Sequence, residues 1–112
     1  MLIACSKDDG AEVASVYSVR YTVFTNGQNA VTINYAGADG KIVTVQQPGN
    51  FMEHQYSVGP VQAGFEASLE AKYTETEDTP VAMLAIEVSE NGGKYVLKKS
   101  VNDSNLLKYT IE

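Results

Sequence analysis

The chain has 112 residues, of which 44% are hydrophobic and 20% are charged, and its formal net charge is −6. This length is typical of one domain with its own core, and the composition excludes a disordered chain. Eight basic residues are scattered along the sequence, so we expect no nucleic-acid partner. No run of about 20 apolar residues predicts a membrane span. One cysteine permits no internal disulfide, and no Cys/His cluster predicts a metal or cofactor site.

The chain begins MLIACSKDDGAE, with its only cysteine at position 5. The stretch LIAC resembles the lipobox that ends a bacterial lipoprotein signal peptide, and this resemblance implies that the thiol of Cys5 receives a lipid. We therefore interpret residues 1–14 as a signal remnant followed by a flexible polar tether. A complete signal includes an apolar segment of about 7–15 residues, so we expect a misassigned start or a trimmed chain. The alternative is a cysteine with no special role.

From residue 15 onward, apolar residues recur with a period of two, which predicts β-strands. In SVYSVRYTVFT (15–25), valines and tyrosines alternate with polar residues, as in a half-buried strand. AVTINYA (30–36) repeats this alternation. The Asp-Gly turn in GADG (37–40) then predicts a hairpin with KIVTVQ (41–46).

The middle of the chain contains one weak and one strong strand pattern. FMEHQYSV (51–58) predicts a weak strand, which the segment GPVQAG (59–64) is expected to break. FEASLEAKY (65–73) has the cleanest alternation of apolar and polar residues in the chain. Its residue types also favour a helix, but Ala67 and Ala71 would lie off the apolar stripe of a helix. We therefore predict a strand.

The last third of the chain predicts three more strands. VAMLAIEVSE (81–90) begins with six apolar residues, which indicates a strand covered on both faces. The turn NGG (91–93) joins it to KYVLKKS (94–100), and LLKYTIE (106–112) closes the domain. Seven or eight short strands with regularly spaced turns predict an all-β sandwich or barrel over residues 15–112.

A resemblance to a known family narrows this fold class. The segments VRYTVFTNGQNAVTINYAGADGK (19–41), GFEASLEAKY (64–73) and LAIEVSENGGKYV (84–96) carry it. Their order resembles small immunoglobulin-like β-sandwich lipoproteins of Bacteroidetes type, similar to the domain of MmpS-type transport accessory proteins. The resemblance implies an immunoglobulin-like antiparallel β-sandwich of about seven or eight strands. Those family members have a paired cysteine bridge, which one cysteine cannot form, and no site residue is carried over.

The only histidine, His54, is a weak candidate for catalysis. A general base needs a partner within hydrogen-bond reach, and the adjacent Glu53 points to the opposite face of a strand. We therefore expect a surface or edge-strand histidine. Met52, His54 and Tyr56 share one strand face that mixes apolar and polar groups. This face is the candidate binding surface, because such an edge can pair with a partner strand.

Seven tyrosines are many for a chain of this length, and all of them lie in predicted strands. They are Tyr17, Tyr21, Tyr35, Tyr56, Tyr73, Tyr95 and Tyr109. One interpretation is that they fill the core and its rim, where a hydroxyl group reaches water. The other is an exposed aromatic surface that binds a ligand by stacking. The sequence leaves both open.

Glu75, Glu77 and Asp78 form the densest acidic cluster, in the predicted loop TETEDTP (74–80). Calcium takes six to eight oxygen ligands, often from alternating carboxylates in a loop. The loop lacks the Asp-x-Asp-x-Asp-Gly pattern of a calcium site, so we expect a solvated loop. Whether it binds calcium stays open.

Together these patterns predict a protein that binds or assembles and is not an enzyme. The sequence has no phosphate-binding loop, no metal-ligand cluster and no activated nucleophile. We expect a membrane-attached protein of the cell envelope, held by lipid at Cys5 and facing the periplasm or the cell surface, with an envelope protein as partner. The alternative is a binding module for a glycan, peptide or small ligand that uses exposed tyrosines.

Overall fold

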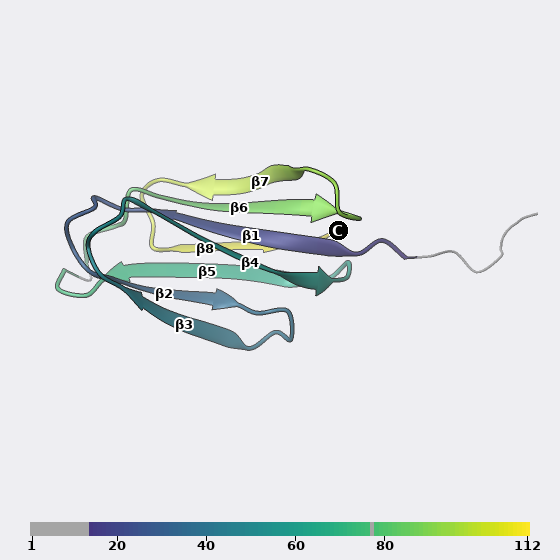
Figure 1. The fold of residues 1–112 in the computed structure, drawn as a ribbon, viewed down its shortest axis with the longest axis horizontal. Helices are drawn as coiled ribbons and strands as arrows, with labels where there is room; N and C mark the ends of the chain where they lie inside the picture. Colours follow the sequence, from purple (N-terminus) through teal and green to yellow (C-terminus); the bar gives the residue numbers. More distant parts are fainter. Residues whose placement is uncertain (1–13, 77) are drawn as a thin grey trace, which may run out of the picture.

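Eight β-strands form two four-stranded sheets that pack face to face in the computed structural model (Figure 1). The structure describes residues 14–76 and 78–112. Cys5 and nearly all of the predicted signal remnant and tether lie outside these ranges. Every pair of neighbouring strands is antiparallel. The predicted all-β antiparallel sandwich is therefore confirmed.

Each sheet combines strands from both halves of the chain. Sheet A has the order β4 (Glu53–Val61), β1 (Tyr17–Phe24), β6 (Met83–Glu90) and β7 (Tyr95–Val101). Sheet B has the order β3 (Ile42–Gln47), β2 (Val31–Ala36), β5 (Glu66–Tyr73) and β8 (Leu106–Thr110). In the described ranges, no helix has the length and hydropathy needed to span a membrane.

Two hairpins, β2–β3 and β6–β7, stay within one sheet, whereas the other connections cross between the sheets. Both hairpins lie where Asp-Gly and Asn-Gly turns predict them. In the β6–β7 turn, Asn91 has a φ of 52° and Gly92 has a φ of 78°. Two consecutive positive φ angles are typical of the tight turn whose twist matches paired strands. Local turn chemistry therefore explains both hairpins.

The core lies between the inner faces of the two sheets. Val19, Tyr21 and Val23 of β1 are completely buried there, as their alternation predicts. The inward residues of β5 are buried too, including Ala67 and Leu69, so the choice of a strand over a helix is confirmed.

Tyr21 links the two sheets across the core. Its hydroxyl group donates a hydrogen bond to the carbonyl oxygen of Ala36, at the end of β2, over 2.8 Å. Burial raises the pKa of Tyr21 to about 12, because the charged phenolate loses its hydration. Tyr35 lies beside it, with ring centroids 5.3 Å apart, and stacks on Tyr56 at 5.0 Å. This row of three rings fills the core towards the β3–β4 side of the sandwich.

The expected break of the fourth strand before Gly59 is wrong, because β4 continues to Val61. Gly59 and Pro60 lie opposite Ser18 in a bulge, so that Tyr17 still pairs with Val61. Gly59 has a φ of 152°, and a side chain on it would come within 2.9 Å of the Ser18 hydroxyl oxygen. Glycine is suited to this conformation and close approach, and the bulge absorbs the extra residue.

We predict that alkaline pH destabilises the fold through Tyr21. An unfolded tyrosine has a pKa of about 10, so the contribution of Tyr21 is complete below pH 10 and is lost as the pH rises through its folded pKa of about 12. The loss amounts to roughly 2–3 kcal/mol of the free energy of unfolding. Urea unfolding between pH 9 and pH 12 measures it (roughly the span set by the two pKa values).

The variant Tyr21→Phe should show a smaller pH dependence than the unchanged chain over this range. It should also be less stable at neutral pH by about 1–2 kcal/mol, because the buried carbonyl of Ala36 loses its donor. The half-buried Tyr109 offers a matched control at neutral pH, where Tyr109→Phe should lose less stability than Tyr21→Phe. Equal pH dependence in Tyr21→Phe and the unchanged chain would contradict the prediction.

Candidate binding site

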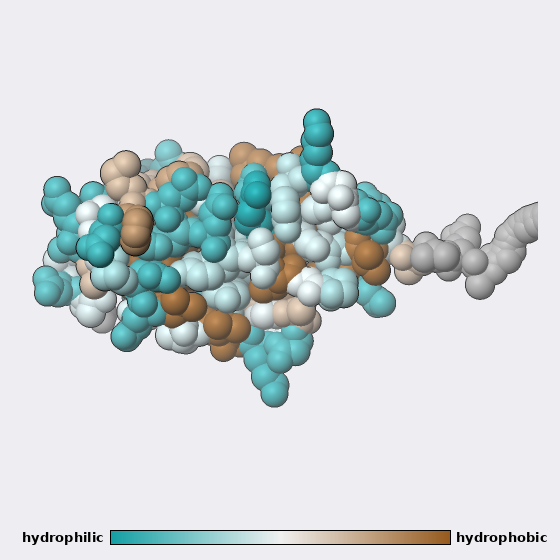
Figure 2. Space-filling model, viewed as in Figure 1, coloured by the Kyte–Doolittle hydropathy of each residue, from teal (hydrophilic) through white to brown (hydrophobic). Residues whose placement is uncertain are grey.

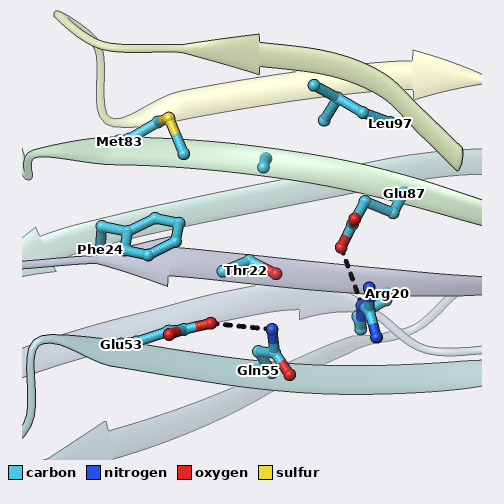
Figure 3. Close-up of a pocket in the computed structure, with 9 residues that line it drawn as sticks. Arg20, Thr22, Phe24, Glu53, Gln55, Met83, Glu87 and Leu97 are labelled. Carbon is cyan, nitrogen blue, oxygen red and sulfur yellow. Dashed lines mark hydrogen bonds and ion pairs between the residues drawn. The ribbon is translucent and has the colours of Figure 1, made fainter. Parts of the chain in front are cut away.

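A hollow of about 300 Å³ lies on the outer face of sheet A (Figure 3). Side chains alternate along a strand, so β1 turns Arg20, Thr22 and Phe24 outward when it buries the residues between them. Thr22 pairs with Gln55 of β4 on one side and with Ala85 of β6 on the other. The short side chains of Thr22 and Ala85 form the floor. The volume lies at the lower end of the range for small-molecule sites.

The wall at one end of the hollow is apolar. Phe24 and Met83 pair with each other there and are half-buried, whereas Leu97 of β7 lies opposite Glu87 near the other end and is 56% exposed. These three side chains come from three adjacent strands of sheet A. An apolar group that enters the hollow would lose contact with water against them, which favours binding.

The wall nearer Arg20 is charged and held in place. Arg20 Nε donates a hydrogen bond to Glu87 Oε1 over 2.8 Å (Figure 3). The guanidinium carbon of Arg20 also lies 4.3 Å from the centre of the Tyr95 ring, in reach of a cation–π contact. The hydrogen bond to Glu87 raises the pKa of Arg20 above its ordinary value. Two partners thus orient this side chain before any ligand arrives.

The side of the hollow formed by β4 has hydrogen-bonding groups. Gln55 Nε2 donates a hydrogen bond to Glu53 Oε2 over 2.9 Å, and both side chains are exposed. The lining therefore contains two carboxylates, one guanidinium group and one amide beside an apolar wall. This mixture fits a ligand that has both an apolar part and groups that form hydrogen bonds.

Thr22 at the floor has a hydroxyl group without a partner. The residue is 3% exposed, and its Oγ1 makes no hydrogen bond within the described ranges. A buried hydroxyl group that loses water and gains no partner destabilises a fold. Most buried polar groups in native proteins have a partner, so a ligand in the hollow offers an explanation for this exception.

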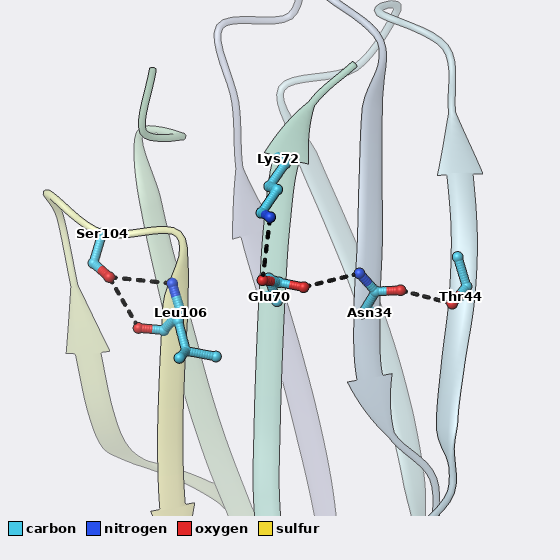
Figure 4. A network of polar contacts seen from close by, with 6 residues as sticks. All are labelled: Asn34, Thr44, Glu70, Lys72, Ser104 and Leu106. Atoms are coloured by element: carbon cyan, nitrogen blue, oxygen red, sulfur yellow. Dashed lines mark hydrogen bonds and ion pairs between the residues drawn. The ribbon is translucent and has the colours of Figure 1, made fainter. Parts of the chain in front are cut away.

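The outer face of sheet B is different, because a chain of polar contacts crosses it (Figure 4). The hydroxyl of Thr44 donates to Asn34 over 2.6 Å, and the amide of Asn34 donates to Glu70 over 3.1 Å. Lys72 lies 3.7 Å from the second carboxylate oxygen of Glu70. These side chains bond one another across β3, β2 and β5. Of the two outer faces, that of sheet A contains the buried hydroxyl group without a partner among the described residues.

The predicted binding residues of the fourth strand do not form one surface. β4 is an edge strand, as expected for His54. However, His54 is 8% exposed, and Tyr56 is half-buried against Tyr35. Both lie on the inner face of β4, since they pair with Val23 and Tyr21 of β1. Met52 is 64% exposed, so it is the only one of the three candidates at the surface.

None of the seven tyrosines is exposed. Tyr21 and Tyr73 are buried in the core. Four others are half-buried and pack against it: Tyr17, Tyr35, Tyr56 and Tyr109. Tyr95 lies on the outer face of sheet A, in contact with Arg20. The structure therefore favours the core interpretation, with Tyr95 as a support beside the hollow.

The structure describes only part of the acidic loop and does not describe Cys5. Glu75 and Asp78 are exposed, while Glu77 lies outside the described residues, as does Cys5. Within the described part of the chain, no group of three or more His, Cys, Asp or Glu side chains is placed to hold a metal ion. That residues 74–80 form a solvated loop therefore stays a prediction, and calcium binding by this loop stays open.

Sequence reasoning missed the hollow because its lining comes from four strands that are far apart in the chain. One pattern in the sequence is consistent with the hollow. The apolar run 81–86 predicts a strand covered on both faces, and two of its residues, Met83 and Ala85, line the hollow. Nothing in the sequence identifies Thr22 as a floor residue or Leu97 as part of the same lining.

We predict that Thr22→Val stabilises the chain by about 1 kcal/mol, because a methyl group of the same shape replaces an unpartnered hydroxyl. Chemical denaturation measures the change. Thr25 is a matched control, since it is also buried but its hydroxyl donates to the carbonyl of Phe51 and accepts from the amide of Gly27. Thr25→Val should destabilise the chain by about 1–2 kcal/mol. A loss of stability in Thr22→Val would show that its hydroxyl already has a partner.

Two comparisons with known proteins gave no match. No protein-family model matches the chain, and no curated protein matches it. The resemblance to immunoglobulin-like lipoproteins thus stays a prediction.

Proposed function

We propose that this chain is a non-catalytic protein of the cell envelope that binds a ligand or a partner through the hollow on sheet A. The unpartnered hydroxyl of Thr22 supports this proposal most directly. Binding would give that hydroxyl the partner it lacks and cover the exposed side chain of Leu97. Both changes favour the bound state.

The lining of the hollow suits recognition without chemistry. Arg20 is already engaged with Glu87 and Tyr95, and Gln55 is engaged with Glu53. Side chains held in this way fix the orientation of a ligand at low entropic cost. The only histidine, His54, lies on the inner face of β4 and does not line the hollow.

The proposal includes a lipid anchor at Cys5 that attaches the protein to the outer membrane or another envelope membrane. The lipobox-like stretch LIAC supports it. The domain would then face the periplasm or the cell surface, where an envelope protein is the proposed partner. Nucleic acid is not proposed, because the chain is acidic overall.

The alternative function is a binding module for a glycan, a peptide or a small ligand. The volume of the hollow favours this alternative, since about 300 Å³ is enough for a small molecule. A surface of exposed tyrosines gives it less support, because none of the seven tyrosines is exposed. The hollow would serve as the site in both cases.

Photo-crosslinking tests which outer face binds. Leu97 on sheet A is 56% exposed, and Leu106 on sheet B is 48% exposed, so p-benzoylphenylalanine at either position gives a matched pair. In intact cells we expect a specific cross-linked product from position 97 and none from position 106. Ala85→Leu, which fills the hollow, should remove the product. Equal products at both positions would contradict a site on sheet A.

Membrane fractionation tests the anchor. Cys5→Ser removes the acceptor thiol, so we expect the precursor to lose its lipid and the protein to leave the membrane fraction. Metabolic labelling with an alkyne fatty acid measures lipid attachment directly. The variant Ser6→Ala is the control and should stay labelled. Labelling that persists in Cys5→Ser would rule out this anchor, and it would leave the proposal about the hollow unaffected.

A further inference from the structure

Each of the two sheets has two edge strands, and an exposed edge can pair with another strand. The edges of sheet A are β4 and β7, and those of sheet B are β3 and β8. Native proteins protect such edges with charges, prolines, bulges or short strands, which prevent unwanted pairing.

Three of the edges have at least one protective device. On β7, Lys98 and Lys99 are exposed, and the register shifts by a bulge at this point. On β4, Pro60 and its bulge interrupt the edge. The strand β8 has five residues, and Lys108 is exposed at its centre.

The fourth edge, β3, has none of these devices. Its sequence, IVTVQQ, contains no charge and no proline, and its pairing with β2 is regular. Four of the six residues are β-branched, a type that favours strands. Ile42 is 57% exposed and Val43 is 38% exposed. In Figure 2, apolar side chains gather at the lower side of the molecule, over β3. Six uncharged residues of this kind form a strand that readily pairs with its own copy.

We propose that β3 pairs with β3 of a second copy of this chain, antiparallel and around a twofold axis at Thr44. Strands in one continuous sheet must match inner residues with inner residues. Pairing Thr44 with Thr44 satisfies this rule, because it sets Val43 opposite the second copy's Val45. Both valines lie on the inner face of sheet B, opposite Tyr35 and Ile33 of β2. The two B sheets then become one eight-stranded sheet.

Charge does not oppose a second copy at this edge. In this register Lys41, just before β3, lies opposite the second copy's Gln47, so no charge faces a like charge. This matters because each chain has a net charge of −6 and would repel its copy at most other surfaces. Like charges directly opposite destabilise strand pairs. Because of the twofold axis, the favourable contact between Val43 and Val45 occurs twice in the dimer.

The dimer should be weak, because one pair of six-residue strands buries less area than a standard interface. Its assembly does not depend on the hollow of sheet A. Thr44 on the axis already donates its hydroxyl to Asn34 (Figure 4), so its side chain is oriented and only its backbone needs a partner. The inference therefore stands or falls separately from the proposed function.

Sedimentation of the full chain tests the dimer. Cys5→Ser serves as the background, because it excludes a disulfide-linked dimer. In a concentration series up to about 1 mM, we expect a monomer–dimer equilibrium. Thr44→Lys should raise the dimer Kd by roughly tenfold or more, since it sets two ammonium groups opposite each other. Thr110→Lys, at the other edge of sheet B, is the matched control and should leave the Kd unchanged.

Cysteine cross-linking tests the register. In the Cys5→Ser background, Thr44→Cys should form a disulfide-linked dimer on mild oxidation, because position 44 faces itself. Gln46→Cys should not, because position 46 faces Ile42 of the second copy. A monomer throughout the series, an unchanged Kd in Thr44→Lys, or cross-linking through position 46 alone would each overturn the proposal. Circular dichroism confirms that every variant is folded.

Discussion

The strict alternation of β1 is the constraint on which the rest of this structure depends. Val19, Tyr21 and Val23 are completely buried between the sheets, and their burial leaves no freedom for the residues between them. Arg20 and Thr22 must therefore lie on the outer face of sheet A. A shift of one residue would exchange the two faces, which would expose the valines and bury a guanidinium group. The stability of the core and the position of the hollow thus have one common cause.

The two outer faces of the sandwich differ in whether their polar groups have partners. On sheet B, Asn34 connects Thr44 with Glu70, so that polar groups on three strands satisfy one another. On sheet A, the contacts of Arg20 and Gln55 are confined to the walls, and Thr22 at the floor is left without a partner. A buried polar group without a partner opposes folding. The core of eight strands must offset this cost, and a bound ligand would remove it.

The hollow and the edge of β3 are two separate features of this sandwich that favour contact with other molecules. Both are local failures of a protective rule, namely that buried polar groups have partners and that sheet edges are interrupted. They lie in different sheets, since the hollow belongs to sheet A and β3 to sheet B. The molecule therefore has room for a ligand and a second copy at once. An arrangement of this kind would let assembly proceed without blocking the binding face.

Patterns along the chain predicted seven or eight strands, both hairpins and the inward residues of β1 and β5, because alternation and turn chemistry are local properties. The extension of β4 was not predicted, since the bulge at Gly59 depends on its neighbour Ser18 in another strand. The candidate site was not predicted either, and His54 and Tyr56 lie inward instead. The order of strands in a sheet brings Leu97 and Thr22 into the lining of one hollow and leaves β3 at an edge. Only tertiary structure decides that order, because it follows from burying all inner faces together.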